Sequence, residues 1–173
     1  MSGAHDEPYN VLFLCTGNSA RSIMAEVLLN DRGRGRFRAY SAGSVPKGAV
    51  HPLALATLSA HGLPTEGSRS KSWNEFAGDG ATPIHIAVPV CDNAAAEVCP
   101  VWPGQPITAH WGIADPALVT GSEDEQREAF AAAFRALDAR IARMVSSSID
   151  LRDRQALQAR MNEIGTRRDG DSR

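Results

Sequence analysis

Short apolar runs alternate with helix-like stretches through most of the chain. These runs predict strands at 11–14, 37–41, 84–90 and about 107–110, each followed by polar or turn-forming residues. Helical spacing of apolar positions predicts helices at 22–31, at 51–61 and from Glu123 onward. Strands that alternate with helices favour right-handed crossovers and a parallel sheet covered on both faces. The pattern therefore predicts an α/β protein, a single-domain three-layer α/β/α fold around a four-stranded parallel sheet.

One strong helical pattern dominates the C-terminal third of the chain. Ser122 is placed to cap this helix, and an apolar stripe is formed by Phe130, Phe134, Leu137 and Ile141. A weaker helix is expected at about 150–163, followed by a polar tail. The chain is thus expected to comprise a flexible leader (1–8), a domain (9–148) and a C-terminal extension (149–173) with a helix and a disordered tail.

Composition and charge exclude several classes of protein. The formal net charge of −2 gives no reason to expect a nucleic acid or an anionic membrane as a partner. The N-terminus has no basic region followed by an apolar one, and no apolar run approaches the length of a membrane-spanning helix. We therefore expect a cytoplasmic protein whose three cysteines are reduced rather than joined in structural disulfides.

The stretch between the first strand and the first helix carries the clearest chemistry. The apolar run 11–14 ends at Cys15, and the loop that follows closes with Arg21 and Ser22. Loop amides and a helix N-terminus favour a bound oxyanion and a thiolate at Cys15, which we expect to act as a nucleophile. The planar guanidinium of Arg21 suits two oxygens of a phosphate-like ion. The expected substrate-binding residues are Thr16, Gly17, Asn18, Ser19, Ala20, Arg21 and Ser22.

The Cys-x5-Arg spacing is the signature loop of cysteine-dependent phosphatases, although the spacing alone is a weak pattern. The alternative for Cys15 is a buried, inert cysteine at the end of a strand. A Walker loop is excluded because no Gly-Lys-Ser/Thr follows.

Two further cysteines and one aspartate lie downstream. Cys91 follows the predicted strand 84–90, and Cys99 lies in a long irregular stretch, 92–106. The alternatives for this pair are a mobile redox segment, two unrelated buried thiols, or a zinc site with His110. Asp115 precedes Pro116 and is either a turn initiator or a general acid on a rigid loop.

Several segments together resemble a known family. Residues 15–22, followed by Ala25-Glu26, are similar to the loop of the low-molecular-weight tyrosine phosphatase superfamily. Within it, CDNAAAEVCPVWPGQPITAHWGIADPA (91–117) and SRSKSWNEFA (68–77) resemble the thioredoxin-type arsenate reductases. The phosphatase branch lacks the downstream cysteine pair and usually carries an aromatic residue after its Asp-Pro, where this chain has Ala117. Family loops often carry a second cysteine where this chain has Ala20.

The resemblance implies a low-molecular-weight phosphatase-like fold and a reaction. Arsenate would occupy the loop, with phosphate and sulfate as its analogues, and Cys15 would attack arsenic while Asp115 donates a proton. Cys91 and Cys99 would then carry the oxidation through successive disulfides to a thioredoxin or glutaredoxin system. No tightly bound cofactor is expected. Some members of this branch hold a potassium ion near the loop, and Asn18, Glu26 and Ser41 are the residues of this chain that could contribute to such a site; otherwise no metal is expected.

Two rival functions remain open at this point. A phosphatase acting on phosphotyrosine or small aryl phosphates would use Cys15, Arg21 and Asp115 but leave Cys91 and Cys99 without a role. A metalloid- or redox-sensing thiol module would need a DNA-binding or partner surface, and neither the charge nor a helix-turn-helix pattern favours one.

Overall fold

The computed structural model describes residues 7–91 and 105–166. A four-stranded, fully parallel sheet forms its centre, with strand order β2-β1-β3-β4. The strands are β1 (Tyr9–Cys15), β2 (Phe37–Gly43), β3 (Ile86–Pro89) and β4 (Ile107–Thr108). The predicted four-stranded parallel sheet is confirmed, and every strand points its carboxyl end to the same edge.

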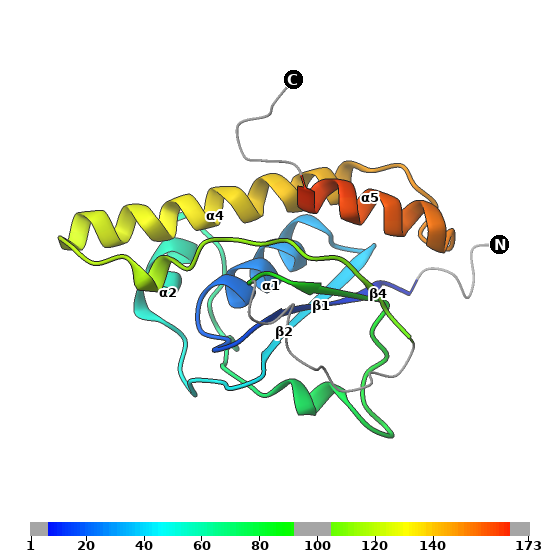
Figure 1. Ribbon diagram of the computed structural model, residues 1–173, viewed down its shortest axis with the longest axis horizontal. Coiled ribbons are helices and arrows are strands. Elements are labelled where there is room, and N and C mark those ends of the chain that lie inside the picture. Colours follow the sequence, from blue (N-terminus) through cyan, green and yellow to red (C-terminus); the bar gives the residue numbers. More distant parts are fainter. Residues whose placement is uncertain (1–6, 92–104, 167–173) are drawn as a thin grey trace.

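Helices lie mainly on one side of this sheet. Figure 1 shows α4 and α5 side by side along one edge of the molecule, with α1 between α4 and the strands. On the opposite side, Phe76 of the short helix η1 packs against Tyr40 of β2, with ring centroids 5.5 Å apart. The helices are α1 (Arg21–Arg32), α2 (Pro52–Ala60), η1 (Trp73–Phe76), η2 (Pro116–Leu118), α4 (Glu123–Ser146) and α5 (Arg154–Thr166).

The core follows from the apolar runs. Residues 11–14 of β1 are fully buried, as expected for a central strand covered on both faces. The predicted stripe of α4 is buried as well, and the hydroxyl of Ser122 accepts a hydrogen bond from the Glu125 amide at its N-terminus. At roughly 25 cal/mol per Å² of apolar area, these central side chains supply a large part of the driving force for folding.

Several predicted boundaries differ from the structure. β1 is longer than predicted because its register with β2 continues to the pair Cys15 and Gly43. β3 is shorter than predicted, and β4 has only two residues, which pair with β3 at the sheet edge. α5 begins at Arg154 rather than 150, because a turn at Asp150 precedes it and Asp153 accepts a hydrogen bond from the Ala156 amide.

The C-terminal helix belongs to the same core as the rest of the fold. Leu157, Met161 and Ile164 of α5 are buried, and α5 contacts both α4 and β4. Most of the predicted leader and the predicted tail lie outside the described residues, as does nearly all of the predicted irregular stretch, 92–106, with Cys99.

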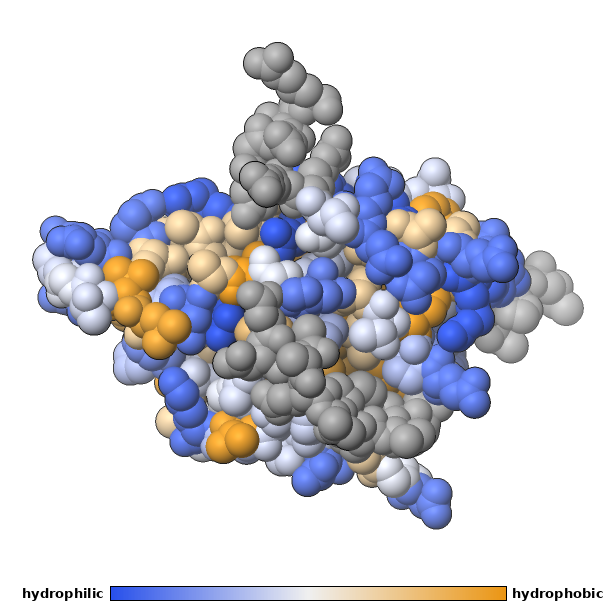
Figure 2. Space-filling view, viewed as in Figure 1, coloured by the Kyte–Doolittle hydropathy of each residue, from blue (hydrophilic) through white to orange (hydrophobic). Residues whose placement is uncertain are grey.

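The surface drawn in Figure 2 shows hydrophobic residues in small separate patches among hydrophilic ones. Within the described ranges, the exposed large hydrophobic residues are Val45, Leu118 and Val119. None of the described helices combines the length and the apolar character needed to cross a membrane.

Candidate active site

The loop that joins β1 to α1 turns several carbonyl groups outward. The amides of Val45, Lys47 and His51 donate to the carbonyls of Thr16, Gly17 and Ser19 at 2.9, 2.9 and 2.8 Å respectively. The hydroxyl of Ser70 also donates to the Gly17 carbonyl, at 3.2 Å. With these carbonyls engaged on the outside, the loop amides are left to face its concave side, which is the arrangement of an anion-binding nest.

The N-terminus of α1 completes this nest. Its N-cap residue is Ala20, which has no side-chain oxygen to accept hydrogen bonds from the first turn. The first amides of the helix and the positive end of its dipole therefore remain available to an anion. The strand, loop and helix start lie where the sequence predicts them, because they are encoded within fifteen consecutive residues, 11–25.

Cys15 lies at the floor of this loop with a relative exposure of 3%. Its sulfur accepts a hydrogen bond from the Asn18 amide at 3.2 Å and lies 2.9 Å from the Ser22 hydroxyl oxygen. Because the Asn18 side chain donates to that hydroxyl oxygen at 2.8 Å, the Ser22 hydrogen is free to point at the sulfur. Two donors directed at one sulfur suit an atom that carries negative charge.

Two backbone positions keep the loop tightly folded. Asn18 adopts φ 44°, in the left-handed region that asparagine tolerates better than most residues. Gly43, at the end of β2, lies so close that a side chain there would run into the carbonyl oxygens of Thr16 and Cys15. The requirement for glycine at 43 is a feature that the sequence analysis missed, because it depends on a contact between distant segments.

Arg21 and Asp115 come together across 94 positions of sequence. The guanidinium contacts the Asp115 carboxylate at 3.3 Å and donates to the Ile113 carbonyl at 2.9 Å. The second carboxylate oxygen accepts a hydrogen bond from the Ala117 amide at 2.9 Å, which makes Asp115 the N-cap of η2. Asp115 is therefore both the predicted turn initiator and a carboxyl group held beside the anion loop, with 25% of its side chain exposed.

Cys91 lies two residues beyond β3 and is buried. Its sulfur is 3.8 Å from the hydroxyl oxygen of Thr16, the residue that follows Cys15. The structure thus brings Cys91 to the anion loop, while Cys99 lies outside the described residues. In the ranges 7–91 and 105–166 there is no group of three His, Cys, Asp or Glu side chains that could hold a metal ion.

The cluster of Asn18, Glu26 and Ser41 contains a residue that sequence analysis did not single out. The ammonium of Lys71 lies 3.2 Å from the Ser41 hydroxyl and 3.7 Å from the Glu26 carboxylate. Burial raises the pKa of Glu26, an effect that the nearby Lys71 partly offsets. Burial likewise lowers the pKa of Lys71, and Glu26 partly offsets that change.

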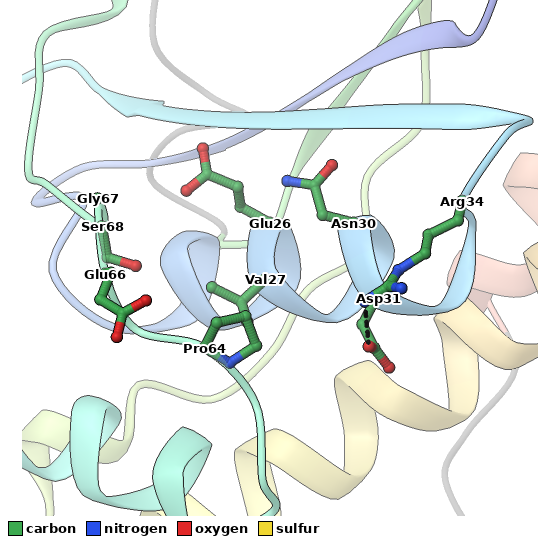
Figure 3. Close-up of a pocket in the computed structure, with 9 residues that line it drawn as sticks. All are labelled: Glu26, Val27, Asn30, Asp31, Arg34, Pro64, Glu66, Gly67 and Ser68. Carbon is green, nitrogen blue, oxygen red and sulfur yellow. Dashed lines mark hydrogen bonds and ion pairs between the residues drawn. The ribbon is translucent and has the colours of Figure 1, made fainter.

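A separate cavity of about 380 Å³ lies beside α1, outside the anion loop. Figure 3 shows Val27 drawn just above Pro64, with the Glu26 side chain turned toward β2. The lining residues are Glu26, Val27, Asn30, Asp31, Arg34, Pro64, Glu66, Gly67 and Ser68. None of the residues predicted to contact substrate lines this cavity, so it is not the reacting centre.

The chain is similar to proteins of a known family. Residues 10–156 match the family described as low molecular weight phosphotyrosine protein phosphatase. An arsenate reductase of Bacillus subtilis is 33% identical over 116 residues, which span 67% of this chain and 80% of the relative. A glutaredoxin arsenate reductase of Synechocystis sp. is 30% identical over 106 residues, which span 61% of this chain and 77% of the relative.

Solved structures agree with the sequence comparisons. An arsenate reductase in a phosphate-binding state has a TM-score of 0.63 and 26% identity, covering 80% of this chain and 97% of that one. A thioredoxin-dependent arsenate reductase of Corynebacterium glutamicum shares the fold, with a TM-score of 0.53 and 24% identity over 80% of this chain and 64% of its own.

The sheet, the anion loop and the profile match together define the class of protein: the chain belongs to the low molecular weight phosphotyrosine protein phosphatase family. The curated relatives described above are arsenate reductases. The predicted resemblance to the arsenate reductase branch of this superfamily is thereby confirmed.

Proposed function

We propose that the protein reduces arsenate to arsenite through a thiol relay that starts at Cys15. The observation that carries this proposal is a second buried thiol, Cys91, beside the anion loop, its sulfur 3.8 Å from the Thr16 hydroxyl. A plain phosphatase has no use for that thiol. The likeness to relatives named arsenate reductase points to the same substrate.

The loop would bind arsenate through its amides and the Arg21 fork. Cys15 thiolate attacks arsenic to form a sulfur–arsenic bond, and the displaced oxygen leaves as water after taking a proton from Asp115. The support for Asp115 as this acid is its position against Arg21, the group that would hold the oxyanion. Arg21 thus holds both the substrate and the acid.

The redox step follows at sulfur. Cys91 attacks the sulfur of Cys15, a disulfide forms, and the electron pair of the sulfur–arsenic bond passes to arsenic, which leaves as arsenite. Cys99 then attacks Cys91 and releases Cys15 as a thiolate. An external dithiol protein reduces the Cys91–Cys99 disulfide and completes the cycle.

The proposed electron donor is a thioredoxin- or glutaredoxin-like protein. Relatives of both kinds are known, a glutaredoxin arsenate reductase and a thioredoxin-dependent one. We propose no tightly bound cofactor, and a reducing compartment such as the cytoplasm would supply the donor.

The test is arsenate-dependent NADPH oxidation with thioredoxin and its reductase. The chain has three cysteines, so each serine variant leaves one defined pair. We expect repeated turnover in the parent protein, at most one equivalent in Cys99→Ser, and a Cys15–Cys91 disulfide in that variant, identified by non-reducing peptide mapping. Replacing thioredoxin by glutaredoxin distinguishes the two donors.

Hydrolysis of an aryl phosphate provides the matched control. Cys91→Ser should abolish arsenate turnover but retain this hydrolysis, because the anion loop and Asp115 remain. If the parent turns over aryl phosphate but no arsenate with any thiol donor, the protein is a phosphatase. If it binds arsenite without consuming arsenate or aryl phosphate, it is a sensing module.

A further inference from the structure

A buried ammonium group lies directly behind the anion loop. The Lys71 side chain is 6% exposed, and its nitrogen lies 3.1 Å from the Arg69 carbonyl and 3.2 Å from the Ser41 hydroxyl. The Glu26 carboxylate is 3.7 Å away. A carbonyl, a hydroxyl and a carboxylate oxygen are the ligand types that a hard metal cation takes. Lys71 therefore occupies an oxygen-lined position with its own positive charge.

The same residues do not fit a potassium ion. Glu26 and Ser41 both face the ammonium, so a second cation there would meet a positive charge at close range. The side-chain oxygen of Asn18 is engaged as well, because it accepts a hydrogen bond from the Lys71 amide at 2.8 Å. The potassium site expected from the family resemblance is thus replaced in this chain.

Lys71 also connects this cluster to the reacting thiol. The backbone amide of Lys71 donates to the side-chain oxygen of Asn18 and so fixes that side chain. The backbone amide of Asn18 in turn donates to the Cys15 sulfur. Its carbonyl accepts a hydrogen bond from the Gly43 amide at 3.0 Å, which ties the same residue to the end of β2. The side chain of Lys71 is thus anchored by Ser41 and Glu26, while its backbone holds the anion loop through Asn18.

We propose that Lys71 is a tethered cation, a positioning residue that holds the anion loop through Asn18 and makes the protein independent of added potassium. The inference requires only that the loop bind an oxyanion, and it holds whether or not arsenate is the physiological substrate. If the ammonium were removed, the carboxylate of Glu26 would remain as the negative charge that a diffusible cation needs in order to bind there.

The cavity beside α1 supplies an entry route for such a cation. Glu26 lines that cavity and is 15% exposed, so it is reachable from solvent. Figure 3 shows its side chain passing from the cavity toward β2, where Ser41 lies. A small cation added to a variant without the ammonium can therefore approach the vacated oxygens.

The experiment compares the parent with Lys71→Met, a neutral side chain of similar length. The dissociation constant of inorganic phosphate and the rate of aryl phosphate hydrolysis are measured in potassium chloride and in choline chloride at equal ionic strength. The parent should behave identically in both salts. Lys71→Met should bind phosphate at least 10-fold more weakly in choline chloride and recover a substantial part of that loss in potassium chloride.

Two further variants separate positioning from folding and from surface charge. Arg38→Met removes an exposed cation of β2 away from the anion loop and should create no difference between the two salts. The double variant Glu26→Gln with Lys71→Met removes the carboxylate beside the ammonium as well. It should fold and bind phosphate weakly, with the same dissociation constant in potassium chloride and in choline chloride.

Three outcomes would overturn the proposal. The first is a parent protein that itself requires potassium for phosphate binding. The second is Lys71→Met that binds phosphate as tightly as the parent in choline chloride. The third outcome matters if Lys71→Met does not fold. If the double variant then folds and binds phosphate with the affinity of the parent, the ammonium does not position the loop. None of these measurements depends on arsenate reduction, so failure here is distinct from failure of the proposed function.

Discussion

The hydroxyl of Ser22 has a single hydrogen, and its neighbours determine where that hydrogen can point. Asn18 donates to the Ser22 oxygen from one side, and the Cys15 sulfur lies 2.9 Å away on another. The Asn18 donor therefore leaves the Ser22 hydroxyl free to donate to the sulfur of Cys15, the proposed nucleophile. Both Asn18 and Ser22 are fully buried, so water does not compete for these bonds.

Ser22→Ala should lower kcat/KM for an aryl phosphate by about 10- to 100-fold, because a hydrogen bond to a charged group is worth about 1.5–3 kcal/mol. Steady-state kinetics check this value. Ser59→Ala, an exposed serine of α2, is the control and should leave kcat/KM unchanged. Equal activity of the two variants would mean that Ser22 does not stabilise the sulfur.

His51 is a helix cap whose function depends on its being neutral. Its Nδ1 accepts a hydrogen bond from the Leu53 amide at the N-terminus of α2, and its ring packs against Phe130, with centroids 4.6 Å apart and planes tilted by 36°. Burial lowers the pKa of His51, and the charge of Lys47 lowers it further, while Asp115 acts in the opposite direction. Protonation would also place a positive charge at the positive end of the helix dipole.

Since the pKa of His51 is lower in the folded protein than the value of about 6.5 in an unfolded chain, the unfolded chain binds the proton first as pH falls. The free energy of unfolding should therefore decrease below about pH 6.5, by at most about 1.4 kcal/mol per pH unit from this group. His51→Asn keeps a capping side chain and should show a weaker loss between pH 7.5 and 5.5 in urea unfolding. His85, whose pKa burial also lowers, is present in both proteins. An unchanged pH dependence in the variant would contradict the assignment.

At the scale of elements, α5 secures the short edge strand β4. The indole of Trp111 donates to the Met161 carbonyl at 3.0 Å, and the amide of Gln158 donates to the Thr108 carbonyl at 2.9 Å. Gly165 lets the last turn of α5 come this close, because a side chain there would meet Trp111 and the carbonyl of His110. The match to the family ends at residue 156, so most of this helix lies beyond it.

Gly165→Val should therefore destabilise the protein by about 1–3 kcal/mol, the usual cost of forcing extra volume into a packed contact. Urea unfolding measures the change. Ala159→Val places the same side chain on an exposed position of the same helix, and helix propensity limits its cost to about 0.5–1 kcal/mol. If both substitutions cost the same, α5 does not pack closely against the 110–111 segment.

At the scale of the whole molecule, the sequence was most informative where structure and chemistry are local. The apolar runs predicted the four strands found in the described residues, and the loop from Cys15 to Ser22 could be read from adjacent residues. Element ends were less predictable, because they depend on pairing: β1 reaches Cys15 only because β2 continues to Gly43.

Features that depend on distant segments escaped the sequence analysis. Lys71 lies in a polar stretch with no periodic pattern, and its role appears only when β2 and α1 bring Ser41 and Glu26 against it. By contrast, the Asp-Pro pair marked Asp115 in the sequence as a turn initiator or a general acid, and the fold brings it to Arg21. The part played by Cys99 remains a prediction.

Binding of an oxyanion in the loop should stabilise the entire fold, because only the folded chain assembles the nest. Inorganic phosphate at 100 times its dissociation constant should add about 2.7 kcal/mol to the free energy of unfolding. For a domain of this size that corresponds to a rise of roughly 5–10 °C in Tm.

Arg21→Ala should lose most of this rise, whereas Arg34→Ala, at an exposed turn just beyond α1, should retain it. Thermal unfolding in phosphate and in chloride of equal ionic strength separates binding from salt effects. If Arg21→Ala showed the same rise in Tm as the parent, the anion would bind away from Arg21, and the proposed reacting centre would be wrong.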